Sequence, residues 1–273
     1  MYEKDIIGED QMSKIKIAFF EIDGTLIDSK KKKITENTKK ALLKLQENGI
    51  KICIATGRPP IEVPDFEKEG LKFDTFLTFN GSYCYNDKEE IFQNPLEKGD
   101  VRQIIQNAKE LGHPIVVATK DRTGANGIED DLIQYFAIAN QEVHVAPDFD
   151  EMIKEDVFQI MMAGDKDQYK DMVKNTKRAA VTAWWDQAVD IIPSDGGKGN
   201  SVKKILEYYQ IDKEESMAFG DGNNDFEMLE EVGHAIAMGN ASEELKAIAD
   251  VICPDVSEDG IYRYCKENDY FSS

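Results

Sequence analysis

The chain has 273 residues, 41% hydrophobic and 32% charged, which is enough for one large packed domain or two of ordinary size. Its 33 basic and 53 acidic residues give a formal net charge of −20, which disfavours nucleic acids and anionic membranes as partners. No stretch approaches the roughly 20 apolar residues of a membrane helix, and the acidic N-terminal residues lack the apolar segment of a signal peptide. We therefore expect a cytoplasmic protein that is a monomer or a weak homo-oligomer.

The first predicted element is a short apolar strand over residues 15–20. It ends in Glu21 and Asp23, followed by Gly24 and Thr25. In an open parallel sheet, ligands bind at the carboxyl ends of the strands. Two carboxylates and a glycine at such an end suit a cation together with an anionic substrate.

Two further strands end in the same way. Thr35 can cap a helix whose apolar residues recur at helical spacing as far as Gly49, and a second buried strand follows over residues 50–55. Strand, helix and strand of these lengths form a right-handed parallel unit. The polar residues after the second strand, and those after a third strand at residues 76–79, are Thr56, Gly57, Arg58 and Asn80.

Residues 83–192 show a different pattern. Shorter apolar runs alternate with helical patterns near residues 101–111, 130–139 and 168–176, which favours an inserted α+β domain with an antiparallel sheet. The polar, glycine-rich residues 119–131 indicate an exposed connection. Trp184 and Trp185 are typical of a packing anchor, with ligand stacking as the alternative.

The parallel pattern resumes after residue 192. Lys198 stands between glycines just before a helix, where lysine and helix N-terminus can both face an anion. A buried strand over residues 216–219 then ends in Asp221, Asn224 and Asp225. A helix over residues 226–232 follows, and then strands over 235–238 and 250–252.

These strand ends bring carboxylates, amides, a hydroxyl and a lysine to one edge of the sheet. Four acids from distant parts of the chain repel one another unless a cation is bound. Because the donors are all oxygens, the cation that they favour is Mg²⁺. A carboxylate beside Mg²⁺ with a fixed lysine is equipped for phosphoryl transfer through an acyl phosphate.

The motifs resemble the haloacid dehalogenase-like (HAD) superfamily, and within it the Cof-type phosphatases of subclass IIB. The matching segments extend from about residue 14 to residue 264 and are EIDGTL (21–26), ATGRP (55–59), NG (80–81), KGNS (198–201), GDGNND (220–225), AMGNA (237–241) and DG (259–260). The resemblance implies a Rossmann-like α/β core, residues 1–82 and 193–273, and an α+β cap, residues 83–192, that sets substrate specificity.

The resemblance also implies roles for the residues. Glu21 would be the nucleophile, Asp23 the general acid and base, and Thr56 and Lys198 would hold the transferring phosphoryl group. The substrate and phosphate contacts would be Gly24, Thr25, Gly57, Arg58, Asn80 and Asn224. The Mg²⁺ ligands would be Glu21, Asp23 (through its backbone carbonyl), Asp221 and Asp225. Arg58 is equally interpretable as a salt-bridge partner, and Asp225 as a helix cap.

One residue departs from the family pattern: the nucleophile is aspartate in the family, and this chain has Glu21. The extra methylene displaces the attacking oxygen by about 1 Å, a misplacement that can cost roughly 100-fold in rate. The glutamate is compatible with a natural variant of low activity, a natural loss of activity or an engineered substitution.

We accordingly expect a Mg²⁺-dependent phosphatase of small phosphorylated metabolites, with sugar phosphates suggested by the resemblance alone. The first alternative is a protein that binds a phosphorylated ligand without turning it over. The second is a phosphomutase.

Overall fold

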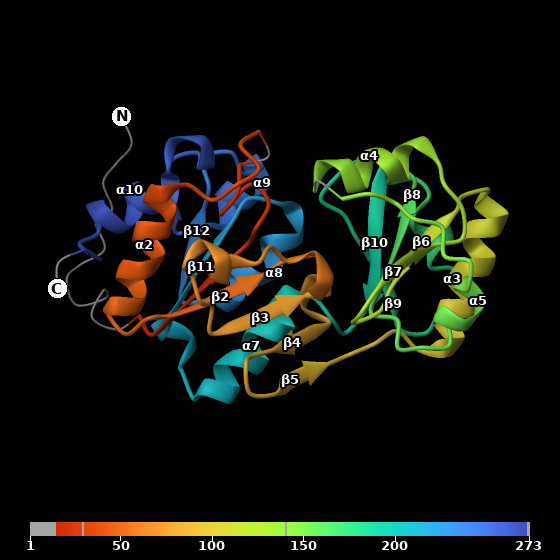
Figure 1. The fold of residues 1–273 in the computed structure, drawn as a ribbon, viewed down its shortest axis with the longest axis horizontal. Coiled ribbons are helices and arrows are strands. Elements are labelled where there is room, and N and C mark those ends of the chain that lie inside the picture. Colours follow the sequence, from red (N-terminus) through yellow and green to blue (C-terminus); the bar gives the residue numbers. More distant parts are fainter. Residues whose placement is uncertain (1–14, 29, 140, 272–273) are drawn as a thin grey trace.

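The computed structural model describes residues 15–28, 30–139 and 141–271, so the acidic N-terminal segment lies outside the described residues. Figure 1 shows two parts side by side, each built on its own sheet. The larger part, the core, contains both ends of the described chain, and the smaller part, the cap, is the segment between β5 and α7. Among the described residues, no helix combines the length and the apolar character needed to cross a membrane.

The core contains an eight-stranded sheet in the order β13-β12-β11-β1-β2-β3-β4-β5. Its first six strands pair in parallel, whereas β4 and β5 are antiparallel. The strands are β1 Ile17–Phe20, β2 Lys51–Ala55, β3 Thr75–Thr78, β4 Tyr83–Tyr85, β5 Glu90–Gln93, β11 Ser216–Gly220, β12 His234–Ala237 and β13 Val251–Ile252.

Helices cover both faces of this sheet. The core helices are α2 Glu36–Glu47, α7 Lys198–Tyr209, α8 Phe226–Glu231, α9 Glu243–Ile248 and α10 Gly260–Glu267. Alternate residues of β1 point to opposite faces, so Phe20 packs with α2 and α10, while Phe19 packs with α7, α8 and α9. Thr35 caps α2 by accepting a hydrogen bond from the Thr38 backbone nitrogen at 3.1 Å, as its sequence predicts.

The cap contains a five-stranded antiparallel sheet in the order β7-β6-β8-β10-β9. Its elements are α3 Lys98–Leu111, β6 Ile115–Ala118, β7 Thr123–Ala125, α4 Asp130–Ile138, α5 Phe149–Met152, β8 Gln159–Ala163, α6 Tyr169–Met172, β9 Ala179–Thr182 and β10 Ala188–Pro193. One face packs on α3, and the other packs on α4 and on Phe79 and Tyr83 of the core. The prediction of an α/β protein with an inserted α+β cap is confirmed.

Three details differ from the sequence-based expectations. Residue 83 does not begin the insert, because the three-residue turn Phe79–Gly81 sends β4 back along β3 and thereby extends the core sheet. Residues 119–131 are not only an exposed connection, because β7 pairs with β6 and buries Gly124 and Ala125. The helix expected at residues 168–176 is the single turn α6.

Candidate active site

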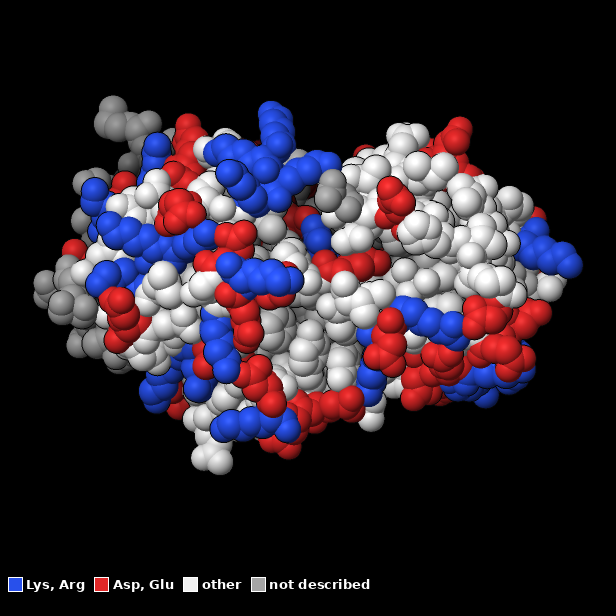
Figure 2. All heavy atoms as spheres, viewed as in Figure 1, with Lys and Arg blue, Asp and Glu red and all other residues white. Residues whose placement is uncertain are grey.

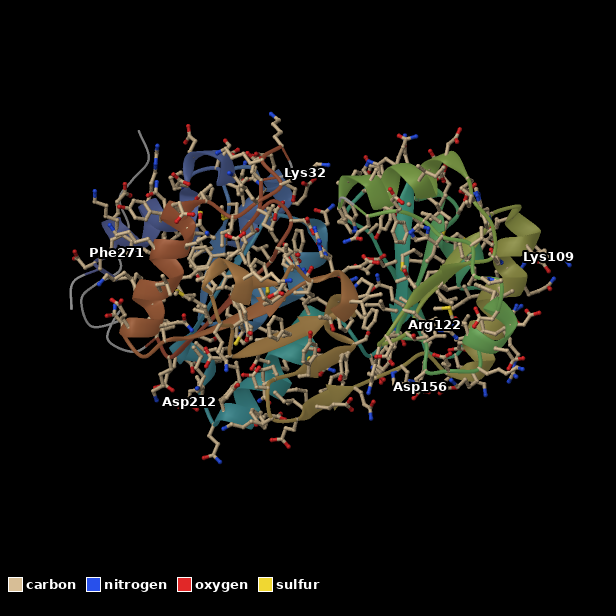
Figure 3. All side chains as sticks on the ribbon, in the orientation of Figure 1. Lys32, Lys109, Arg122, Asp156, Asp212 and Phe271 are labelled. Carbon is tan, nitrogen blue, oxygen red and sulfur yellow. The ribbon has the colours of Figure 1, made fainter. Side chains whose placement is uncertain are left out.

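The carboxyl ends of the parallel core strands face the cap, and a pocket of about 130 Å³ lies between them. Figure 3 shows side chains from both parts meeting in the space between the large sheet and α4, and Figure 2 shows acidic and basic atoms along this seam. The predicted site residues that line the pocket are Glu21, Asp23, Thr56, Gly57, Arg58, Asp221 and Asn224. The other predicted site residues lie behind that lining and are hydrogen-bonded to it or packed against it: Gly24, Thr25, Asn80, Lys198 and Asp225.

Glu21, directly after β1, is buried with only 5% of its surface exposed. One carboxylate oxygen accepts from the backbone nitrogen of Ile22 at 2.8 Å, and the other accepts from the Lys198 ammonium. Both oxygens therefore already have a donor.

Lys198, the first residue of α7, is fully enclosed and lies between two acids, Glu21 and Asp225. Its Nζ donates to Asp225 Oδ1 at 2.6 Å, while Asp225 Oδ2 accepts from the backbone nitrogens of Asp221 and Gly222 at 2.9 and 3.0 Å. Asp225 thus fixes both the lysine and the loop that carries Asp221.

Asp221 lies against the loop after β1. Its Oδ1 accepts from Thr25 Oγ1 at 2.7 Å, and a Cβ on Gly24 would overlap its carboxylate. Gly24 also has φ +78°, a conformation that favours glycine. Gly24 and Thr25 therefore hold Asp221 in place rather than facing the pocket.

The buried acids carry more negative charge than Lys198 neutralises. Burial, together with the charges of Asp225 and Asp23, outweighs the opposing effect of Lys198 and raises the pKa of Glu21 to about 7. Burial together with the charges of Asp225 and Glu21 also raises the pKa of Asp221 well above its ordinary value. A bound cation would relieve both carboxylates.

The hydrogen bonds show which of the predicted Mg²⁺ ligands have side chains that other groups already engage. In the part of the chain that the structure describes, no three acidic, histidine or cysteine side chains are grouped as a metal ion would require. The Asp225 side chain is engaged by Lys198 and the backbone, and the Asp23 side chain by Arg58. Glu21 and Asp221 accept hydrogen bonds as well, but both line the pocket, and a carboxylate oxygen that accepts one hydrogen bond keeps a lone pair for a metal. These two carboxylates fit Mg²⁺, which commonly takes one or two protein carboxylates and completes its shell with water and phosphate.

Arg58 forms the most extensive polar contact of the pocket. Its Nε and Nη2 donate to the two carboxylate oxygens of Asp23 at 2.7 and 2.6 Å. Its Nη1 donates to the Glu62 carbonyl at 3.0 Å and its Nη2 to the Ala139 carbonyl at 3.3 Å. Because Ala139 follows α4, the same guanidinium bonds the acid–base candidate, the core turn and the cap.

Asn80 makes a second link between core and cap. It has φ +51°, a conformation that asparagine tolerates, and its Nδ2 donates to Asp190 at 2.9 Å and Gln159 at 3.2 Å. Its Oδ1 accepts from Asn224 Nδ2 at 3.0 Å. The predicted phosphate ligand Asn80 is therefore occupied in joining the two parts.

Several lining residues were not predicted from the sequence. They are Pro59, Glu62 and Gly222 in the core, and Tyr135, Phe136, Ile138, Ala139, Gln159, Met161 and Asp190 in the cap. Trp184, predicted as a packing anchor, also lines the pocket. Asp190 and Gln159 carried a usable signal, because each is a lone polar residue within an apolar strand. Tyr135 and Phe136 carried none, because aromatic residues on a helix ordinarily belong to the core.

Comparisons with known proteins agree on one family. Residues 18–264 match a family model described as haloacid dehalogenase-like hydrolase. The putative phosphatase YkrA of Bacillus subtilis (strain 168) is 34% identical over 254 residues, which cover 92% of this chain and 97% of that protein. From the same organism, 5-amino-6-(5-phospho-D-ribitylamino)uracil phosphatase YitU is 28% identical over 92% of this chain and 96% of its own.

A solved structure has the same architecture. The HAD subclass IIB sugar phosphatase BT4131 superimposes with a TM-score of 0.84 at 26% identity, covering 93% of this chain and 99% of its own. The match spans both parts of the molecule, so it supports the arrangement of core and cap.

Proposed function

Because the chain belongs to the haloacid dehalogenase-like hydrolase family and is an enzyme of the phosphatase type, we propose that it hydrolyses small phosphorylated metabolites with Mg²⁺. The observation that carries this proposal is the pocket that combines a buried carboxylate, Glu21, and a partly buried one, Asp221, with a buried lysine, Lys198, that bonds to Glu21. The relatives named above act on a sugar phosphate and on a phosphoribitylamino uracil. A small phosphate monoester is their common feature, and sugar phosphates are the first class to test.

In the proposed reaction, the Glu21 carboxylate attacks phosphorus, and the bond between phosphorus and the ester oxygen breaks to leave an acyl phosphate on Glu21. Asp23 gives a proton to the departing oxygen. Asp23 then takes a proton from water, which attacks the acyl phosphate and releases inorganic phosphate and the carboxylate. Thr56, which lines the pocket, binds the transferring oxygens. Lys198, enclosed behind Glu21, contributes positive charge from there, and Mg²⁺ held by Glu21 and Asp221 would supply more.

The hydrogen bonds impose two conditions on these steps. Both oxygens of Asp23 accept from Arg58, so at least one of these bonds must break before Asp23 can carry a proton. Both oxygens of Glu21 are also engaged, one by Lys198 and one by the Ile22 nitrogen. One of these bonds to Glu21 must therefore break before its oxygen can attack phosphorus. This requirement favours the alternative of a protein that binds a phosphorylated ligand without turning it over.

Phosphate release from a panel of sugar phosphates, with Mg²⁺ or with a chelator, tests the proposal. We expect Glu21→Asp to raise Mg²⁺-dependent turnover by roughly 100-fold, because the shorter side chain restores the position of the attacking oxygen. Equal turnover by both proteins would show that glutamate serves equally well as the nucleophile. No release by either protein would favour the binding protein, and an isomerised sugar phosphate would favour the mutase.

A further inference from the structure

The pocket has an apolar wall on the cap side. Tyr135 of α4 and Trp184 lie with ring centroids 4.8 Å apart, and Trp184 Nε1 donates to the Tyr135 hydroxyl at 2.8 Å. Phe136 and Met161 also line the pocket there. Such a wall covers one face of a ring and offers little to an extended polar chain.

The charges near this wall are mostly negative. Of the pocket-lining residues in the described chain, Arg58 is the only cation, and Asp23 already accepts from it through both oxygens. Asp190 accepts from Asn80 and from the Tyr135 hydroxyl. The Glu62 carboxylate differs, because no hydrogen bond or ion pair to it is found among the described residues.

Glu62 is fixed near the reacting end of the pocket. It closes the short helix η1, Pro60–Glu62, and its backbone carbonyl accepts from Arg58 Nη1 at 3.0 Å. Burial, together with the charges of Asp190 and Asp23, outweighs the effect of Arg58 and raises the pKa of Glu62 to about 7. A second anionic group on a ligand would be repelled here, whereas a cation or an N–H donor would gain a partner.

We propose that Glu62 is a specificity-determining residue that binds an amino group on the alcohol part of the substrate. The substrate class is then a phosphate monoester of a ring-shaped amino alcohol without a second anionic group. This inference rests on the proposed function, since it assumes that the phosphate lies at Glu21 and Asp221. It adds the contact that this pocket makes with the alcohol part of the substrate.

Binding of ligands that cannot be hydrolysed tests the inference separately from turnover. The probes are the methylene phosphonate analogues of glucosamine 6-phosphate and glucose 6-phosphate, together with the bisphosphonate analogue of glucose 1,6-bisphosphate. Calorimetry on the full chain with Mg²⁺ should show the amino ligand binding about tenfold more tightly than the neutral one, and the doubly anionic ligand about tenfold more weakly.

The variant Glu62→Gln keeps the size of the side chain and removes its charge. We expect it to bring the amino and neutral ligands to within about twofold of each other. Glu67→Gln, at an exposed residue outside the pocket, is the matched control and should keep the full preference. If Glu62→Gln does not fold, the ratio in the unaltered protein and in Glu62→Asp decides the question.

Three results with the unaltered protein would overturn the inference. They are equal binding of the amino and neutral ligands, tighter binding of the bisphosphonate than of the neutral ligand, and no binding of any probe. A preference that persists unchanged in Glu62→Gln would also overturn the role of this residue. Release of phosphate from p-nitrophenyl phosphate tests the proposed function independently of the role of Glu62. A binding preference without release would support the inference and contradict the phosphatase reaction.

Discussion

Lys198 provides the positive charge between two acids inside the core. Its side chain is fully enclosed, as is that of Asp225, and Glu21 is nearly so. Burial lowers the pKa of a lysine, but here Asp225 and Glu21 outweigh burial and raise the pKa of Lys198 above its ordinary value. The lysine therefore stays charged, and its loss would leave two buried carboxylates without their cation.

We predict that Lys198→Met lowers the free energy of unfolding by about 3–5 kcal/mol near pH 7.5 in the presence of a chelator. The methionine retains the apolar volume, so the loss reports the charge. Adding Glu21→Gln should restore part of the stability, because one of the unpaired carboxylates is then neutral. Urea denaturation measures both effects.

Lys203→Met is the control, because Lys203 is on the same helix and its side chain is 54% exposed. A Lys198→Met protein as stable as this control would show that the buried charges are neutralised by another route, such as protonation of Glu21. The same result would remove the argument that the carboxylates of the pocket need a cation.

At the scale of the elements, the sequence predicts the parallel part of the fold well. Each strand from β1 to β3 and β11 is a short apolar run that ends in a polar, glycine-bearing motif, and strand, helix and strand are consecutive. Because the carboxyl ends of parallel strands meet at one edge of the sheet, these motifs predict which residues form the core side of the pocket. The sequence therefore predicts that Glu21, Asp23 and Asp221 lie close together, and all three line the same pocket.

The cap side of the pocket could not be predicted in this way. It is assembled from α4, β8, β10 and a loop, which are brought together by antiparallel pairing between segments far apart in the chain. Local periodicity reports which residues are apolar, but not which cap face meets the core. The boundary at residue 83 failed for a related reason, since a three-residue strand such as β4 becomes recognisable only through its partner.

Arg58 connects the core loops of Asp23 and Glu62 with the end of α4 in the cap. We predict that Arg58→Lys lowers kcat/KM by roughly 10- to 100-fold in any form of the protein that turns over substrate. A lysine ammonium cannot pair with both oxygens of Asp23 and also reach the carbonyls of Glu62 and Ala139. We also expect faster hydrogen exchange in α4, because its end loses a bond to the core. Steady-state kinetics and exchange mass spectrometry measure the two effects.

Arg102→Lys, at an exposed position of α3 outside the pocket, is the matched control and should change neither quantity. If Arg58→Lys lowered activity while exchange in α4 stayed constant, Arg58 would act on Asp23 alone. Unchanged activity would exclude the ion pair from the reaction.

At the scale of the whole molecule, the net charge of −20 opposes the approach of a phosphorylated substrate. The charge is not evenly distributed over the face shown in Figure 2, where Lys and Arg side chains gather on the core beside the seam. Figure 3 places Lys32 in this region, at the edge of the core that faces the cap. The exposed lysines 30–33 follow directly on the loop that carries Glu21 and Asp23.

We predict that these lysines offset the overall charge near the pocket, so that the double substitution Lys30→Gln and Lys33→Gln raises KM for a phosphate monoester roughly two- to tenfold at low ionic strength. The difference should shrink at physiological salt, because the screening length falls from about 30 Å at 0.01 M to about 8 Å at 0.15 M. Lys203→Gln with Lys204→Gln is the control, since it removes the same charge from α7, on the other side of the core in Figure 1. If the substitutions at both pairs of lysines raised KM equally, net charge alone would matter. Only a larger effect at residues 30 and 33 shows that lysines following the loop of Glu21 and Asp23 attract the substrate.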